Sequence, residues 1–304
     1  MSKKPLILDI KGNSLDDGPG IRSVVFFKGC PLSCRWCHNP ESKSPRLEIL
    51  FDAAKCVACG ACAWVCPRGA LSAENPFFVD RDRCELCMAC AGVCPSGALS
   101  PAGRRMEQAE IMEKVLRDKP FYDNSGGGVT FSGGEPTLFM PFLAGLLKNL
   151  KEKGVHTLIE TCGLFNLDRF KALVLPFIST IYFDLKLVDP GAHQEYCGAG
   201  NNRILENLAR LHTLSRGGRF EIIPRLPLVP GITALGENLA AAAEYLSAHR
   251  ITRLNLLPYN PLWIEKLTKL GLKNPYPAEH PLMNWLPQEE MEKCKALFSR
   301  YGIH

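Results

Sequence analysis

The sequence predicts an α/β fold, a partial (β/α)6 barrel related to the TIM barrel, with a small inserted ferredoxin-like domain. Short apolar runs alternate with amphipathic ones along most of the chain, which is the pattern of βα units. A cysteine-rich segment interrupts this alternation. Polar residues gather just after the apolar runs, where the carboxyl ends of barrel strands converge on one mouth. We therefore expect a barrel in residues 1–50 and 103–304 and an insert in residues 51–102.

Six strands and six helices are expected outside the insert. The predicted strands are Ser23–Phe27, Gly128–Ser132, Thr157–Glu160, Thr180–Leu185, Phe220–Leu226 and Arg253–Leu257. The predicted helices lie near Glu107–Asp118, Phe139–Lys153, Leu167–Leu175, Arg203–Ser215, Leu235–His249 and Gln288–Tyr301. A doubly wound sheet is the alternative, but it would bring only some of the polar strand ends to one crevice.

Composition and cysteine content limit the class of protein. A chain of 304 residues has room for a large domain and a small one. It contains no apolar run of membrane-spanning length and no apolar core of a signal peptide, so we expect no membrane association and a cytoplasmic location. Fourteen cysteines in that reducing compartment indicate metal or cluster ligands rather than disulfides. The formal charge of +5 is weak evidence for nucleic acid, because three bound clusters would contribute about −5.

Eight cysteines form two copies of one motif, C-x2-C-x2-C-x3-C-P, which is the ferredoxin pattern for two 4Fe-4S clusters. The last cysteine of each copy is expected to bind the cluster of the other copy. The predicted ligands are Cys56, Cys59, Cys62 and Cys94 for one cluster, and Cys84, Cys87, Cys90 and Cys66 for the second. Two zinc sites are the alternative. They are less favoured because the repeat reproduces all four spacings and the trailing proline.

A third run, Cys30, Cys34 and Cys37, offers three thiolates where a cubane cluster has four irons. One iron would therefore stay open to another ligand. A zinc site completed by His38 is the alternative, but it would place two ligands awkwardly on adjacent residues. Gly133-Gly134-Glu135 follows the next predicted strand; its glycines permit close backbone approach, and its carboxylate can accept from an ammonium group.

The spacing of Cys30, Cys34 and Cys37, with the aromatic Trp36, resembles the radical S-adenosylmethionine (SAM) superfamily. Further motifs resemble the glycyl-radical-enzyme activating enzymes, in order along essentially the whole chain. They are Asp17–Arg22, Phe26–Cys30, Cys37–Pro40, Glu160–Gly163, Asp184–Lys186, Leu228–Gly231 and Leu257–Asn260. The insert is typical of the longer members, which serve dehydratases, decarboxylases and lyases.

This resemblance implies roles for individual residues. Trp36, Gly133, Gly134 and Glu135 would contact SAM, with Glu135 at the methionine amino group. Lys186 would meet the methionine carboxylate, and Arg225 and Asn260 would be polar contacts near the mouth. Glu160, Thr161 and Asp184 would hold the ribose or a monovalent cation. Asn260 stands where some members carry histidine. Asp17 and Arg22 would lie where the protein substrate docks.

The resemblance also implies the reaction and the partners. A reduced flavodoxin or ferredoxin would supply an electron through the insert, and reductive cleavage of SAM would lead to removal of a glycine Cα hydrogen from a partner glycyl radical enzyme. Two alternatives remain. A radical SAM enzyme acting on a small molecule or another peptide would not need Asp17–Arg22, and a simple electron carrier would leave Gly133–Glu135 without a purpose. The sequence does not name the partner.

Three cysteines fall outside the motifs: Cys162, Cys197 and Cys294. We expect them to be ordinary buried or half-buried thiols. The segment 263–285, rich in proline, lysine and leucine, is expected to cover the mouth or contact the partner.

Replacing Cys34 with alanine should abolish formation of 5′-deoxyadenosine, because two thiolates cannot hold the predicted cluster in place. The measurement is chromatography of the nucleoside products after incubation with SAM and a reductant. Full activity in Cys34→Ala would contradict the predicted reaction.

Overall fold

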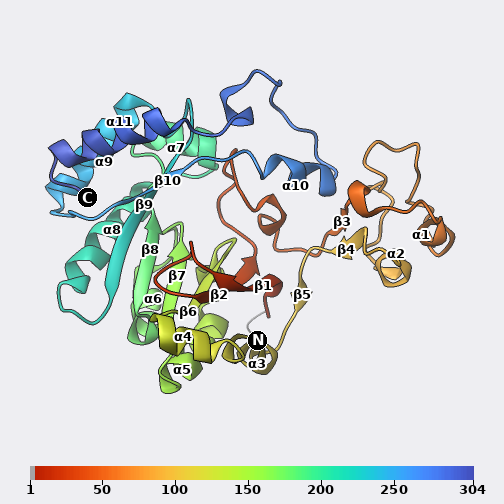
Figure 1. Ribbon diagram of the computed structural model, residues 1–304, viewed down its shortest axis with the longest axis horizontal. Helices are drawn as coiled ribbons and strands as arrows, with labels where there is room; N and C mark the ends of the chain where they lie inside the picture. The colour runs from red at the N-terminus through yellow and green to blue at the C-terminus, as the bar shows by residue number, and fades with distance from the viewer. Residues whose placement is uncertain (1–3) are drawn as a thin grey trace.

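The computed structural model describes residues 4–304 (Figure 1). Residues 1–3 of the predicted first barrel segment lie outside the described residues. The main sheet has eight strands in the order β10-β9-β8-β7-β6-β2-β1-β5. Helices cover its convex side, and the insert projects at one end of the molecule, where α1, α2, β3 and β4 are labelled in Figure 1.

Six consecutive strands of this sheet are parallel, and they correspond to the six predicted ones. They are β2 (Arg22–Lys28), β6 (Gly128–Gly133), β7 (His156–Thr161), β8 (Thr180–Asp184), β9 (Glu221–Leu228) and β10 (Asn255–Pro258). Their order in space follows their order in the chain. In a doubly wound sheet the order of the strands would reverse near the centre of the sheet, so that alternative is wrong.

The sequence did not predict the antiparallel edge of the sheet. β1 (Leu6–Ser14) pairs antiparallel with β2, and the two-residue β5 (Arg104–Arg105) pairs antiparallel with β1. β1 buries Leu6 and Ile7 but exposes Lys11 and its neighbours. Only half of this strand therefore carries the apolar pattern of a buried strand.

All six predicted helices are present: α3 (Gln108–Leu116), α5 (Met140–Glu152), α6 (Leu167–Leu173), α8 (Asn202–Ser215), α9 (Gly236–Ala248) and α11 (Gln288–Arg300). Outside the insert, three further helices were not predicted: α4 (Lys119–Ser125), α7 (Pro190–Cys197) and α10 (Ile264–Lys269). Within residues 4–304, every helix is too short or too polar to traverse a lipid bilayer.

The two faces of the parallel strands carry different chemistry, because successive side chains point to opposite sides. One face supplies apolar residues such as Phe131, Ile159 and Ile181 to the large core shared with the helices. The other face, on the concave side, carries polar residues at the carboxyl ends of the strands, including Glu160 and Asp184. The alternation thus separates a packing surface from a chemically active one.

The insert has its own sheet and its own small core. β3 (Ile49–Phe51) pairs antiparallel with β4 (Leu99–Pro101), which brings the start and end of the insert together. The buried residues are Ile49, Leu71, Val79, Cys90 and Leu99. Two short helices, α1 (Ala61–Trp64) and α2 (Ala89–Val93), follow the paired cysteines of the two repeats.

The sequence repeat in the insert is also a repeat of backbone conformation. Ala58 and Leu86, at equivalent places, both have positive φ values of 53° and 57°. Gly60 (φ 74°) and Met88 (φ 62°) also correspond, and each precedes a short helix. Positive φ is unfavourable for residues other than glycine. Its recurrence at Leu86 and Met88 indicates that cysteine placement, rather than local propensity, determines this backbone.

Candidate functional site: the mouth of the barrel and the cysteine pocket of the insert

The loops at the carboxyl ends of the strands pack into a second apolar core. The cysteine loop after β2 contributes Leu32, Cys34 and Trp36 to this core. Its other members come from the loops after β7, β8, β9 and β10 and from the segment 263–285. Those further members are Cys162, Leu187, Cys197, Val229, Ile232, Tyr259, Trp263, Leu267 and Leu282. The segment 263–285 therefore does cover the mouth.

Backbone hydrogen bonds fix the cysteine loop in place. The amides of Gly29 and Cys30 donate to the carbonyls of Ser42 and Lys43 at 2.6 and 3.0 Å, which closes the loop on itself. The amide of Ser33 donates to Cys197 at 2.8 Å. The Lys43 ammonium donates to the carbonyl of Cys34 at 2.7 Å. The three predicted ligands thus sit on a loop anchored from several sides.

Two cysteines outside the predicted ligand set contact that set. A hydrogen bond with the Cys197 thiol, opposed by burial, is the main cause that lowers the pKa of Cys34 to about 7; the ammonium groups of Lys186 and Lys43 act in the same direction. A hydrogen bond with Cys30, together with burial, raises the pKa of Cys162. Burial raises the pKa of Cys37 to about 12. Cluster ligands must be thiolates, and the lowered pKa of Cys34 favours that form.

The glycines of Gly133-Gly134-Glu135 permit close packing inside the protein. Gly133 has φ 103°, and a Cβ there would lie 2.5 Å from backbone atoms of Phe27. A Cβ at Gly134 would lie 2.2 Å from the carbonyl oxygen of Gly29. The amide of Glu135 donates to that same carbonyl at 2.7 Å. These contacts attach the Glu135 loop directly to the start of the cysteine loop.

The Glu135 carboxylate is fully buried and extensively hydrogen-bonded. Its Oε1 accepts from the amide and hydroxyl of Thr137 at 3.1 and 2.7 Å and from the hydroxyl of Thr161 at 2.9 Å. Its Oε2 accepts from the amide of Cys162 at 2.7 Å. A carboxylate oxygen has two lone pairs, so Oε2 can still accept from one more donor.

Thr161 does not join the group for which it was predicted. Its hydroxyl donates to Glu135, whereas Glu160 and Asp184 lie on the opposite face of the strands. Neighbouring residues of a strand point to opposite sides, and this separates Thr161 from Glu160. The expected trio is therefore a pair, Glu160 and Asp184, with Thr161 acting through Glu135.

Arg225 joins that pair. It donates to Glu160 at 2.5 Å and to Asp184 at 2.9 and 3.1 Å, and its guanidinium stacks over the Tyr182 ring at 5.1 Å. The hydroxyl of Ser132 donates to the other oxygen of Glu160 at 2.5 Å. Burial raises the pKa of Glu160 although Arg225 opposes it. Burial would raise that of Asp184 too, but Lys186 and Arg225 together hold the pKa of Asp184 below its usual value.

Lys186 forms a largely buried ion pair with Asp184, rather than a pair on the surface. The two charged groups are 3.0 Å apart, and the Lys186 side chain is only 10% exposed. Burial disfavours its charge, but Asp184 and the sulfurs of nearby cysteines outweigh burial and raise the pKa of Lys186. The protein therefore keeps a cation beside the cysteine loop, where the Asp184 carboxylate is its main stabilising partner.

Arg22 lies in a different environment from the one predicted. It is fully buried, and it donates to the Thr130 hydroxyl at 2.7 Å and to the carbonyls of Pro19 and Val129 at 3.0 and 3.1 Å. Burial lowers its pKa to about 10. A side chain enclosed in this way cannot meet a docking partner, so that prediction is wrong for Arg22. Asp17 is half-buried and accepts from the Ser14 hydroxyl.

The remaining predicted residues lie at the mouth. Trp36 is 4% exposed and belongs to the mouth core. Asn260 is half-buried, and its side-chain oxygen accepts from the amide of Leu262 at 3.3 Å. The ring of His38 lies 5.8 Å from that of Tyr259.

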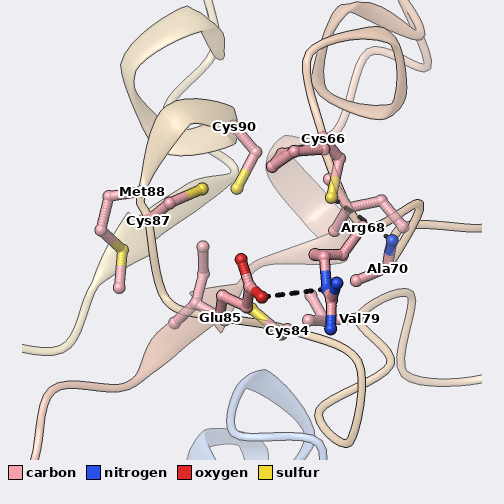
Figure 2. Close-up of a pocket in the computed structure, with 12 residues that line it drawn as sticks. Cys66, Arg68, Ala70, Val79, Cys84, Glu85, Cys87, Met88 and Cys90 are labelled. Carbon is pink, nitrogen blue, oxygen red and sulfur yellow. Dashed lines mark hydrogen bonds and ion pairs between the residues drawn. The ribbon is translucent and has the colours of Figure 1, made fainter.

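The insert contains a pocket lined by cysteines from both repeats. Cys84, Cys87 and Cys90 come from the second repeat and Cys66 from the first (Figure 2). An ion pair between Arg68 and Glu85, 3.0 Å long, links the two repeats beside this pocket (Figure 2). The exchange of Cys66 into the other repeat is the grouping that the ferredoxin pattern requires.

Backbone amides support the last cysteine of each repeat. The amide of Ala70 donates to the sulfur of Cys66 at 3.3 Å. The backbone N–H of Leu99 is the main cause that lowers the pKa of Cys94 to about 7. Within residues 4–304 no three His, Cys, Asp or Glu side chains converge closely enough to share a single metal ion. Thiolates of a cubane each bind a different iron, so they stand farther apart.

The family model described as "Radical SAM superfamily" matches residues 24–234, which extend from β2 to the loop after β9. The chain belongs to this superfamily. The match includes the cysteine loop, the Glu135 loop and the Arg225 network, so these features lie inside the domain that defines the family.

Relatives of known activity indicate which kind of radical SAM protein this chain is. The chain is 38% identical to the trans-4-hydroxy-L-proline dehydratase activating enzyme of Clostridioides difficile, over 97% of this chain and 96% of that protein. It is 35% identical to the choline trimethylamine-lyase activating enzyme of Oleidesulfovibrio alaskensis, with the same coverage. The chain is accordingly a radical SAM oxidoreductase, an activating enzyme that uses SAM to generate a glycyl radical.

A solved structure with little sequence identity to this chain has the same fold. A radical SAM methyltransferase from Sphaerobacter thermophilus matches with a TM-score of 0.55 and 13% identity, over 98% of this chain and 75% of that one. At this identity the likeness concerns the fold alone.

Sequence reasoning missed several residues of the mouth. Ser132, Lys43 and Cys197 each contact a predicted site residue. Ser132 could have been found, because it shares a strand face with Glu160 across the β6–β7 pair. Lys43 and Cys197 had no local signal, since loop folding alone brings them to the cysteine loop.

Replacing Arg225 with methionine should lower the free energy of unfolding by about 3–5 kcal/mol, because Glu160 and Asp184 would lose their shared buried cation. Arg219→Met is the matched control, since Arg219 is exposed. Anaerobic urea unfolding followed by circular dichroism measures the difference. Equal stability of the two variants would show that Arg225 is not the centre of the network.

Proposed function

We propose that this chain activates a glycyl radical enzyme of the dehydratase, decarboxylase or lyase type and uses three 4Fe-4S clusters to do so. One observation carries the three-cluster part: Cys66 of the first repeat lines the same pocket as Cys84, Cys87 and Cys90 of the second. If each repeat formed its own metal site from its own four cysteines, no cysteine of one repeat would need to lie among those of the other. The remaining set, Cys56, Cys59, Cys62 and Cys94, would hold the partner cluster.

Cys30, Cys34 and Cys37 would hold the third cluster at the mouth, with SAM on its open iron. When bound, this pair of cofactors supplies the one-electron reductive cleavage of a sulfonium bond. The protein residues would orient these two cofactors and shield them from water. The hydrogen bond with Cys197 favours the Cys34 thiolate, and the mouth core containing Trp36 and Tyr259 excludes water from the same region.

Charged groups at the mouth match the polar ends of SAM. Oε2 of Glu135 keeps one lone pair for the methionine ammonium group, and Gly133 and Gly134 hold the Glu135 loop beside Cys30. Lys186 supplies a cation for the carboxylate. Glu160 and Asp184 would receive the ribose hydroxyls or a monovalent cation, and Arg225 holds both carboxylates in position. Trp36 and Asn260 would complete the contacts, while Thr161 orients Glu135.

The partner is proposed from the relatives. Their named substrates of activation include a dehydratase, a trimethylamine-lyase and, for the relative from Tractidigestivibacter scatoligenes, an indoleacetate decarboxylase. Identities of 35–38% to all three favour none of these types. Asp17 remains the candidate docking residue. A reduced flavodoxin or ferredoxin would be the electron donor, in the cytoplasm.

The activity is tested by an anaerobic electron paramagnetic resonance (EPR) spectrum of the reconstituted protein with SAM, a reductant and a panel of glycyl radical enzymes. A glycine-centred doublet should appear with one panel member and name the partner. Deoxyadenosine formed without any doublet would mean that the partner is outside the panel. Neither signal from a protein with full iron content would contradict the proposed activity.

Replacing Cys87 with alanine tests the role of the insert. The variant should lose iron from the insert and keep SAM binding, because Cys87 lies outside the mouth. Turnover with a protein reductant should slow. Iron analysis, equilibrium binding of SAM and deoxyadenosine assays measure the three effects. Unchanged iron content would argue against clusters in the insert, and equal loss of SAM binding would mean that the insert is structural.

A further inference from the structure

We propose that the short helix α10 is a clamp that holds the insert at a fixed position against the mouth, and that Lys266, Lys269 and Arg81 are its positioning residues. The inference rests on the proposed clusters in the insert. In Figure 1, α10 lies between the mouth loops and β3 of the insert. It contacts β3 on one side and the 3-10 turn Pro40–Ser42 on the other.

Lys266 of α10 contacts the residues that follow Cys37. The Lys266 ammonium donates to the carbonyl of His38 at 2.8 Å and to the side-chain oxygen of Asn39 at 2.9 Å. It also pairs with the carboxylate of Glu41 at 3.2 Å. On the same helix, Leu267 is buried in the mouth core with Cys34 and Trp36. Three polar contacts and one apolar contact therefore attach α10 to the cysteine loop.

The C-terminal end of α10 contacts the insert. Lys269 donates to the carboxylate of Asp52 at 2.9 Å. Arg81, which belongs to the insert, donates to the carbonyl of Lys269 at 3.3 Å, where the helix ends and its free carbonyls attract a cation. The same guanidinium donates to the carbonyls of Ile49 and Val79, both at 3.3 Å.

Ile49 and Val79 line the pocket of Cys66, Cys84, Cys87 and Cys90. Arg81 therefore connects the wall of that pocket to the last residue of α10, and Lys266 connects α10 to the residues after Cys37. Gly271 permits this arrangement. Its φ of 72° ends the helix, and a Cβ there would lie 1.9 Å from Nη1 of Arg81. A backbone without a side chain at this point lets Arg81 reach the helix end.

A second tie runs in parallel at the base of the insert. The fully buried ammonium of Lys28 pairs with Glu48 at 2.6 Å and donates to the carbonyl of Glu41 at 2.5 Å. This tie joins the end of β2 to the residue before β3. The insert would thus stay attached to the barrel without α10. What α10 adds is a fixed distance between the insert and the mouth. This matters because electron transfer slows steeply as the distance between donor and acceptor grows.

The test uses the reconstituted holoenzyme with the double variant Arg81→Met and Lys269→Met. Arg83→Met with Lys273→Met is the matched control, because these exposed neighbours carry the same charges and neither belongs to the clamp. Iron content and SAM binding are measured first. Amide hydrogen exchange of residues 264–272 and 49–51 should then quicken in the clamp variant and stay unchanged in the control.

Deoxyadenosine formation is compared with two reductants. With reduced flavodoxin, which delivers electrons through the insert, the clamp variant should slow by about tenfold. With titanium(III) citrate, a small reductant that needs no protein docking on the insert, both variants should match the unsubstituted enzyme. Equal flavodoxin-driven rates in the clamp and control variants would overturn the proposal.

Gly271→Ala provides a second route if the double variant loses iron. It displaces Arg81 without removing a charge, and it should reproduce the flavodoxin-specific slowing. Normal exchange and normal flavodoxin-driven rates in Gly271→Ala would equally overturn the clamp. Failure of the clamp and failure of the proposed clusters are distinguishable, because only the second predicts that Cys87→Ala leaves the iron content unchanged.

Discussion

The functional architecture depends on one constraint: six parallel strands stand side by side in the order in which the chain forms them. This order directs every carboxyl end to the same edge of the sheet. The loop after β2 brings the cysteines, the loop after β6 brings Glu135, and the ends of β7, β8 and β9 bring Glu160, Asp184 and Arg225. Groups separated by up to two hundred residues thereby share one mouth.

The mouth is organised in two layers that use the alternation of strand residues. The Glu135 carboxylate, with Thr137 and Thr161, forms a neutral-donor layer in which every contact is a hydroxyl or an amide. The Arg225 network forms an ionic layer in which buried groups of opposite charge pair with one another. A carboxylate that faces only uncharged donors keeps its negative charge available to a cationic ligand. In the ionic layer, Arg225 and Lys186 compensate the charges of Glu160 and Asp184 and hold both carboxylates in position.

The insert has to hold eight thiols in defined positions although its apolar core is very small. Backbone amides directed at Cys66 and Cys94, together with positive φ values at Leu86 and Met88, give a chain path that local preferences alone would not select. A bound group that satisfies all the thiols would offset this cost.

The sequence by itself determined the six βα units and the two-fold repeat of the insert, because both are visible in local periodicity and spacing. Positions near the ends of three predicted strands also sufficed to indicate Glu160, Asp184 and Arg225. Only the tertiary structure decided that Arg22 is enclosed, that Thr161 serves Glu135, and that Cys197, Lys43 and α10 meet the cysteine loop. The physical reason is that burial and hydrogen-bond partners depend on which segments pack together. A charged residue at the start of a strand looks the same in the sequence whether its neighbours in space are water or carbonyl oxygens.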